Sequence, residues 1–181
     1  MRPLLTAALA LLAAACSVSE TRNETNVTKA EARQVAPILT SAEARDWHSF
    51  AQPQVARVTH VALDLALDFQ ARRVGGTATL DLQAAEGAGE IILDTKGLEI
   101  IGITDAEGDP LPYRLGEGDE IRGRPLAVRM GDARRIVVRY RSGENAAALQ
   151  WLTPQQTHGG RHPYLFSQGQ AILNRTWIPT Q

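Results

Sequence analysis

Apolar and polar residues alternate along two neighbouring stretches in the first half of the chain. In the first stretch the apolar positions are Val61, Leu63, Leu65, Leu67 and Phe69. In the second they are Ala78, Leu80, Leu82 and Ala84. Successive side chains of a β-strand point to opposite faces of a sheet, so each stretch predicts a strand with one apolar and one polar face. Only "QARRVGG" separates them, which predicts an antiparallel hairpin.

Several further short strands are predicted downstream of this hairpin. They cover Glu90 to Asp94, Leu98 to Thr104, Leu111 to Leu115, Pro125 to Met130 and Arg134 to Arg141. The segments between them are rich in turn-forming residues, as in "EGAG", "EGDP" and "GEGDEIRG". We therefore expect an all-β domain over residues 57–181, either a β-sandwich or a saddle-like curved sheet of mostly antiparallel strands.

The segment from Asn145 to Gln181 concentrates aromatic, His, Gln and Pro residues. Within it, "PYLFSQGQA" predicts a strand bounded by Pro163, and alternation places Gln168 and Gln170 on the same face. Two neighbouring carboxamides can bind a polar ligand group, because each offers two donors and one acceptor. They can equally form a hydrogen-bonded pair at an internal seam. The residues alone leave both interpretations open.

The sequence offers few other candidates for chemistry. His158 and His162 have the spacing of two ligands on one helical face, but two glycines lie between them and a proline follows, which predicts a loop. No Glu stands beside His158 as a general base, and no third ligand is evident. Ser167 lacks the glycines of a nucleophile elbow. We expect neither a metal site nor a nucleophile in this chain.

The runs "ALQWLTPQQT" and "HPYLFSQGQAI", with the spacing Gln168-x-Gln170-x-x-x-x-Arg175, resemble the N-terminal domain of the leukotriene-A(4) hydrolase-like branch of the aminopeptidase N (M1) zinc metallopeptidases. The upstream "LDTKGLEI" is similar to the same relatives, and the resemblance covers about residues 57–181. It implies that Gln168, Gln170 and Ala171 line the substrate cleft, with Gln170 meeting the free α-amino group of a peptide. Arg175 is assigned a structural role, as a salt bridge at the domain seam.

The resemblance also implies what this chain lacks. Members of the family bind zinc through H-E-x-x-H and a distant Glu, and these motifs do not occur in this sequence, which ends at "WIPTQ". We expect the zinc to belong to the absent catalytic domain, which would be the partner of this one, and the isolated chain to be inactive. The rival interpretation is a non-catalytic β-sandwich lipoprotein that acts as a binding or scaffold module.

The N-terminus has the pattern of an export signal. Arg2 precedes an apolar run, Leu4–Ala15, that is too short to span a bilayer as a helix. We expect residues 1–15 to be a signal peptide, Cys16 to be acylated as in bacterial lipoproteins, and residues 16–56 to form a mostly disordered tether. Cleavage by ordinary signal peptidase is the alternative. Either way we expect an exported protein, in the bacterial periplasm or anchored to the outer membrane through its lipid.

Charge excludes one class of partner. The formal net charge is -1, so no strong field draws nucleic acid to the chain. A run of arginines between Arg122 and Arg141 is interspersed with acidic residues, which favours ion pairs between strands over a basic patch.

Overall fold

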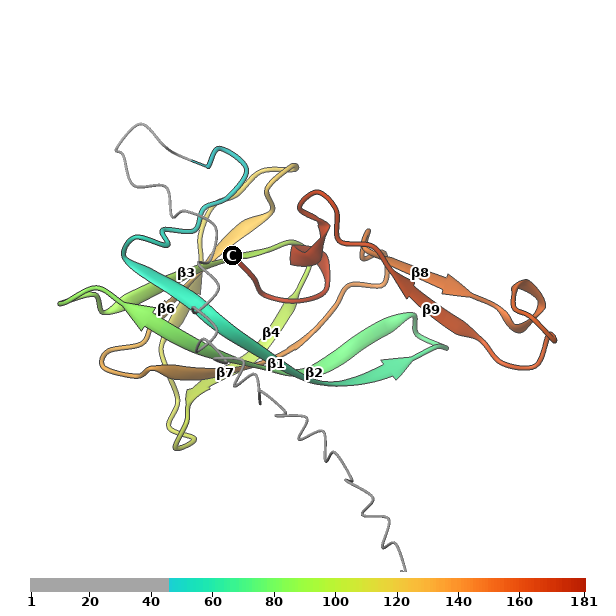
Figure 1. The fold of residues 1–181 in the computed structure, drawn as a ribbon, viewed down its shortest axis with the longest axis horizontal. Helices are drawn as coiled ribbons and strands as arrows, with labels where there is room; N and C mark the ends of the chain where they lie inside the picture. Colours follow the sequence, from blue (N-terminus) through green and yellow to red (C-terminus); the bar gives the residue numbers. More distant parts are fainter. Residues whose placement is uncertain (1–45) are drawn as a thin grey trace, which may run out of the picture. The chain divides into compact units, whose positions relative to one another are not determined.

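The computed structural model describes residues 46–181, and within them the fold is built from two antiparallel sheets and a separate hairpin (Figure 1). The four-stranded sheet has the order β1-β2-β7-β4, with β1 at Ala56–Asp68, β2 at Arg73–Ala84, β7 at Arg135–Arg141 and β4 at Glu99–Asp105. The three-stranded sheet has the order β3-β6-β5, with β3 at Glu90–Thr95, β6 at Arg124–Arg129 and β5 at Tyr113–Leu115. The predicted strands and their antiparallel pairing are confirmed.

The core lies between these two sheets. The four-stranded sheet contributes fully buried side chains at Leu80, Ile136, Val138 and Tyr140. The three-stranded sheet contributes Ile91, Leu93, Leu126 and Val128. Each set follows the two-residue period of its strand, so the alternation read from the sequence is what assembles the sandwich. Burial of these side chains is the main source of stability, at about 25 cal/mol per Å² of apolar surface.

The apolar row of β1 is less buried than its pattern suggested. Val61 and Leu63 pair with Leu80 and Ala78, so they share the core-facing side of the sheet. Nevertheless Val61 and Leu63 are both 41% exposed and Leu67 is 49% exposed. Three residues of β1 still belong to or pack against the core cluster, namely Ala56, Val58 and Leu65. Alternation therefore identified the correct face of β1, but the described part of the chain covers that face only in part.

The long β1–β2 hairpin depends on one glycine within β2. Gly76 pairs with Leu65 and has a φ of 151°, a backbone conformation that other residues rarely adopt. A Cβ atom at this position would lie 2.1 Å from the carbonyl oxygen of Asp64. The two strands can approach each other here only because residue 76 has no side chain.

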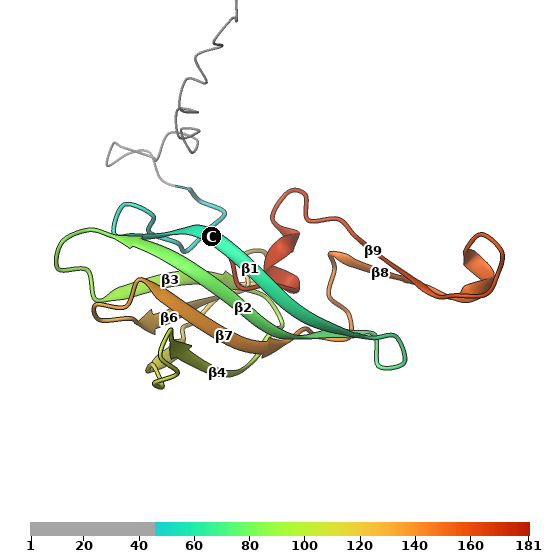
Figure 2. The same cartoon turned by 60° about the horizontal axis from the view of Figure 1, so that its bottom comes forward.

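The C-terminal segment forms a hairpin and two short 3₁₀ helices. It comprises β8 (Leu149–Leu152), η1 (Pro154–Gln156), β9 (Tyr164–Ser167) and η2 (Leu173–Thr176). The β8–β9 hairpin projects from the sandwich in both views (Figures 1 and 2). Its Trp151 ring meets Phe69 at the end of β1 edge to face, with the ring centroids 5.1 Å apart. The predicted strand over "PYLFSQGQA" is thus shorter than expected, because β9 ends at Ser167.

The residues just before β1 also pack on the sheets. The backbone N–H of Phe50 and the hydroxyl of Ser49 both donate to Asp94 of β3. The Arg122 guanidinium lies 4.1 Å from the centre of the Phe50 ring, within the range of a cation–π contact. No helix in residues 46–181 is long and apolar enough to cross a membrane. The expected signal peptide, the acylated Cys16 and most of the expected tether lie outside the described residues.

Candidate functional site

The two candidate carboxamides lie in the loop that connects β9 to η2, not on a strand. Gln168, Gln170 and Ala171 are all exposed, and the peptide bond between Gln170 and Ala171 is cis. The Gln168 backbone N–H still donates to the carbonyl of Ala148, at 2.8 Å, which extends the hairpin by one contact. The Gln168 side-chain oxygen then accepts from the Gln170 N–H at 3.2 Å. This local bond takes the place of the expected strand alternation.

The exposure of this loop bears on the two interpretations that the sequence left open. An internal seam requires the two side-chain amides to be buried and bonded to each other. Instead Gln168 bonds to the backbone of Gln170, and within the described residues the Gln170 side chain has no hydrogen bond. The Gln170 carboxamide keeps two donors and one acceptor available for a ligand.

The loop rests on η2 through two contacts. The Leu173 N–H donates to the carbonyl of Gly169 at 2.8 Å. A Cβ atom built on Gly169 would lie 2.0 Å from Oδ1 of Asn174, so a larger residue here would have to displace the Asn174 side chain. The Asn174 side chain is itself held, because its Oδ1 accepts from the Trp177 indole N–H at 3.2 Å. The position of the carboxamides is therefore set by the position of η2.

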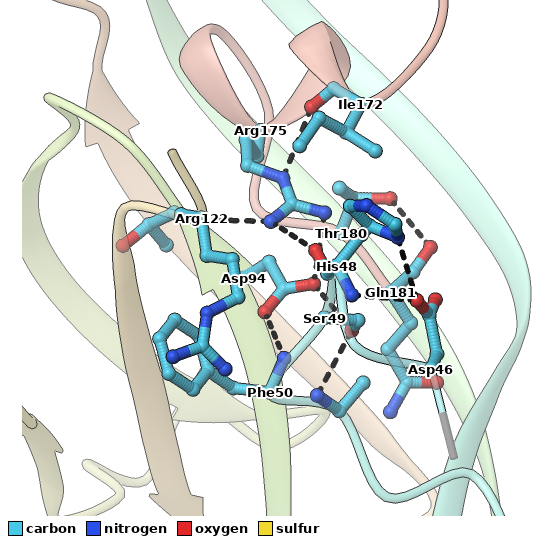
Figure 3. A network of polar contacts seen from close by, with 12 residues as sticks. Asp46, His48, Ser49, Phe50, Asp94, Arg122, Ile172, Arg175, Thr180 and Gln181 are labelled. Atoms are coloured by element: carbon cyan, nitrogen blue, oxygen red, sulfur yellow. Dashed lines mark hydrogen bonds and ion pairs between the residues drawn. The ribbon is translucent and has the colours of Figure 1, made fainter. Parts of the chain in front are cut away.

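A buried ion pair holds η2 against β3 (Figure 3). Nη2 of Arg175 lies 3.3 Å from Oδ2 of Asp94, and the two side chains are 5% and 0% exposed. Asp94 also accepts from the Ser49 hydroxyl at 2.5 Å and from the Phe50 N–H at 2.8 Å. A buried carboxylate is costly unless it is paired and hydrogen-bonded, and Asp94 has both kinds of partner.

Arg175 uses the rest of its guanidinium on backbone carbonyls. Nη1 donates to His48 at 2.8 Å and to Arg122 at 2.9 Å, and Nε donates to Ile172 at 3.0 Å. One side chain thus joins the segment before β1, the turn before β6 and the start of η2 (Figure 3). Arg175 does form a salt bridge, and its partner Asp94 lies in β3 of the same domain.

Sequence reasoning did not single out Asp94 as a functional residue. It is the second-last residue of β3, and its neighbours Leu93 and Thr95 are also buried, which is an unusual place for a carboxylate. The signal was present in "LDTKGLEI", because an acidic residue inside an otherwise buried strand requires a buried cationic partner. The sequence alone could not identify Arg175 as that partner.

The histidine pair lies in an exposed loop, and several arginines of the run form ion pairs. His158 and His162 lie in the exposed loop between η1 and β9, and no group of three or more metal-ligating side chains occurs among residues 46–181. Arg135 of β7 lies 2.6 Å from Asp81 of β2, and this hydrogen-bonded partner lowers the pKa of Asp81. The Arg114–Glu90 pair joins β5 to β3 in the same way. Within the run, Arg135 and Arg141 confirm the expectation of ion pairs between strands, whereas Arg122 pairs with Asp119 three residues before it.

One surface pocket lies away from the carboxamide loop. Its lining comes from β2, the β4–β5 turn and the β6–β7 turn, and includes Asp81, Asp105, Glu107, Asp132 and Arg135. Asp81 and Arg135 already pair with each other there. None of the residues predicted to bind substrate lines this pocket, so we do not assign it to the same site.

The domain is an antiparallel β-sandwich with an exposed loop that carries two carboxamides. A buried ion pair anchors this loop through η2. No protein-family model matches the chain. It is 34% identical over 162 residues to the leukotriene A-4 hydrolase homolog of Botryotinia fuckeliana, covering 85% of this chain and 25% of that protein. It is 38% identical to leucine aminopeptidase 2 of Sclerotinia sclerotiorum, covering 69% of this chain and 22% of that protein.

Solved structures agree with these relatives. Yeast leukotriene A4 hydrolase in complex with bestatin superimposes with a TM-score of 0.69 at 26% identity, covering 78% of this chain and 23% of that one. The chain belongs to the leukotriene A4 hydrolase group of M1 peptidases, and its fold is that of their N-terminal β domain. It spans about a quarter of the length of these relatives.

Proposed function

We propose that this chain is the substrate-cleft domain of a zinc aminopeptidase that removes N-terminal residues from peptides. The observation that carries the proposal is the exposed loop after β9, where the Gln170 carboxamide is free of partners within the described residues. A neutral carbonyl oxygen can accept a hydrogen bond from the ammonium group of a peptide. Gln168 and Ala171 complete the exposed surface of the same loop.

The relatives support an enzyme in which this domain is one part. They are named as a leukotriene A-4 hydrolase homolog and a leucine aminopeptidase, and each is about four times as long as the matched region. We propose that the zinc of the complete enzyme is held by another domain, because the H-E-x-x-H motif of the family does not occur in this sequence. No step of the reaction is assigned to a metal bound by this chain. The chain alone is proposed to be inactive.

We also propose that the enzyme is exported. A signal peptide over residues 1–15 and acylation of Cys16 would place the enzyme in the periplasm or on the outer membrane of a bacterium, attached through its lipid. Labelling of the protein with a radioactive or alkyne-bearing fatty acid tests this directly. Incorporation that disappears in Cys16→Ser supports a lipoprotein, and unchanged or absent incorporation contradicts it.

The binding role of Gln170 is tested by kinetics of the complete enzyme. Removing one hydrogen bond to a charged group costs about 1.5 kcal/mol, which corresponds to about ten-fold in affinity. Gln170→Ala should therefore raise the KM for aminoacyl-4-nitroanilides about ten-fold, with a small change in kcat. Gln54→Ala is the matched control, because Gln54 is exposed in the turn before β1. A KM that is the same in both variants would remove Gln170 from the site.

The inactivity of the isolated chain has its own test. The 181-residue chain is incubated with the same anilides, with and without added zinc and with a chelator. We expect no hydrolysis under any of these conditions. Chelator-sensitive cleavage by the purified chain would contradict the proposal that the metal belongs to another domain.

A further inference from the structure

We propose that Arg175 is a positioning residue, which holds the Gln168–Ala171 loop at the geometry that substrate binding requires. The inference rests on the proposed function, because it concerns the same loop. Arg175 itself is 4% exposed and cannot touch a substrate. Its effect must therefore travel through η2 to the exposed carboxamides.

The first step of this connection joins Arg175 to the sandwich. Its guanidinium contacts four acceptors, namely the Asp94 carboxylate and three backbone carbonyls. Its own carbonyl accepts from the Lys96 N–H at 2.7 Å, and the Asp94 N–H donates to Thr180 at 2.7 Å. η2 and the residues after it are thereby attached to the end of β3, a strand whose side chains form part of the core. This end of the connection is rigid because the core is closely packed.

The second step joins η2 to the loop. The Leu173 N–H donates to the Gly169 carbonyl at 2.8 Å, and the Gly169 backbone lies directly against the Asn174 side chain. Gly169 is the residue between the two candidate glutamines. A displacement of η2 must consequently move Gln168 and Gln170, because Asn174 of η2 is in direct contact with Gly169. An error of about 1 Å in the position of a binding group can cost much of its effect.

The substitution Arg175→Lys provides a selective perturbation. It keeps the positive charge next to Asp94, but an ammonium cannot reproduce the planar fork that reaches four acceptors in different directions. The ion pair can persist while the links to His48, Arg122 and Ile172 are weakened. Arg175→Lys therefore loosens η2 without leaving an unpaired carboxylate in the core.

A double-mutant cycle in the complete enzyme tests whether Arg175 acts through Gln170. Arg175→Lys alone should raise the KM for aminoacyl-4-nitroanilides about five-fold, with kcat changed less than about two-fold. In a Gln170→Ala background the same substitution should raise KM by less than about two-fold, because the group that it positions is already gone. Arg135→Lys, in the exposed pair with Asp81, is the matched control and should leave KM unchanged.

Two results would overturn the positioning role. One is a KM that Arg175→Lys leaves unchanged while Gln170→Ala raises it; the other is an equal rise in both backgrounds, which would mean that Arg175 acts independently of Gln170. If Gln170→Ala itself has no effect, the proposed function fails, and the positioning claim is decided by a measurement that needs no substrate. That measurement is amide hydrogen exchange in the 181-residue chain.

Hydrogen exchange reads the state of the loop directly. The amides of Gln168 and Leu173 are bonded to Ala148 and Gly169, so Arg175→Lys should increase their exchange rates about ten-fold while the amides of β2 and β7 stay protected. Unchanged rates at both positions would contradict the proposal. If Arg175→Lys does not fold, Ser49→Ala is the milder variant for the same comparison, because it removes only one bond to Asp94.

Discussion

Replacing Asp94 with alanine removes one half of the buried ion pair and leaves the other half in place. The Arg175 guanidinium then remains in a site where its side chain is 5% exposed, without a counter-charge. The hydroxyl of Ser49 and the N–H of Phe50 also lose their acceptor. Asp94 is the only carboxylate that pairs with Arg175 among the described residues, because Asp46, the other carboxylate of this network (Figure 3), contacts His48 instead.

The expected loss of stability follows from these contacts. Breaking a buried ion pair by removing one partner costs about 3–5 kcal/mol, because the remaining charge is uncompensated. A domain of this size has a free energy of unfolding of about 5–15 kcal/mol, so Asp94→Ala should remove a large part of it. Asp94→Asn keeps an oxygen for the Phe50 N–H and should lose less. The double variant Asp94→Leu/Arg175→Met should recover much of the loss, because it leaves no buried charge.

Denaturant unfolding followed by circular dichroism measures these differences. The comparison uses the midpoint at constant slope, so that a change in midpoint reports a change in stability. Arg135→Ala breaks an ion pair whose arginine side chain is 54% exposed, and it should shift the midpoint only slightly. If Asp94→Ala shifts the midpoint no more than this control, or if the double variant is less stable than Asp94→Ala, the network does not anchor the C-terminal segment.

Three further predictions concern the core, the β1–β2 hairpin and a surface carboxylate. Leu80→Ala should reduce the free energy of unfolding by about 2–5 kcal/mol, whereas Leu67→Ala, at a position 49% exposed, should reduce it by less than about 1.5 kcal/mol. Equal losses in urea titrations would contradict the observed burial. Gly76→Ala should destabilise the β1–β2 hairpin by more than about 2 kcal/mol, while Gly89→Ala, with nothing within 4 Å of its Cβ, should not. Thermal melts that reverse this order would refute the close approach of Gly76 to the Asp64 carbonyl. Hydrogen bonds from the backbone and side chain of Arg122 lower the pKa of Asp119. The contribution of Asp119 to stability is therefore present above about pH 4 and is lost as the pH falls through the lowered pKa. Asp119→Asn should reduce the difference in the free energy of unfolding between pH 5 and pH 3.

The strands could be predicted from the sequence because a two-residue period depends only on neighbouring residues. Leu80 is fully buried and lies on the predicted face. Leu67 lies on the predicted face too, yet it is 49% exposed. The period reveals which side chains share a face, but what covers that face depends on strands that are distant in sequence.

The residues of the candidate site remain a prediction, and their local geometry could not be predicted from the sequence. Gln168 and Gln170 are exposed together, as a binding role requires, but the strand ends before them because Gln168 bonds to the backbone of Gln170. The anchor of the loop could not be predicted either. Asp94 and Arg175 meet only after the C-terminal segment has folded back on β3, and nothing in the local sequence specifies that contact.

A crystal structure of the complete enzyme with a bound peptide analogue that has a free α-amino group tests the central claim most directly. The account predicts that the side-chain oxygen of Gln170 lies within about 3.2 Å of the α-amino nitrogen. It also predicts that Arg175 and Asp94 remain paired behind the loop. A ligand bound with its amino group far from Gln170, or a loop turned away from the metal, would contradict the assignment of this domain to the substrate cleft.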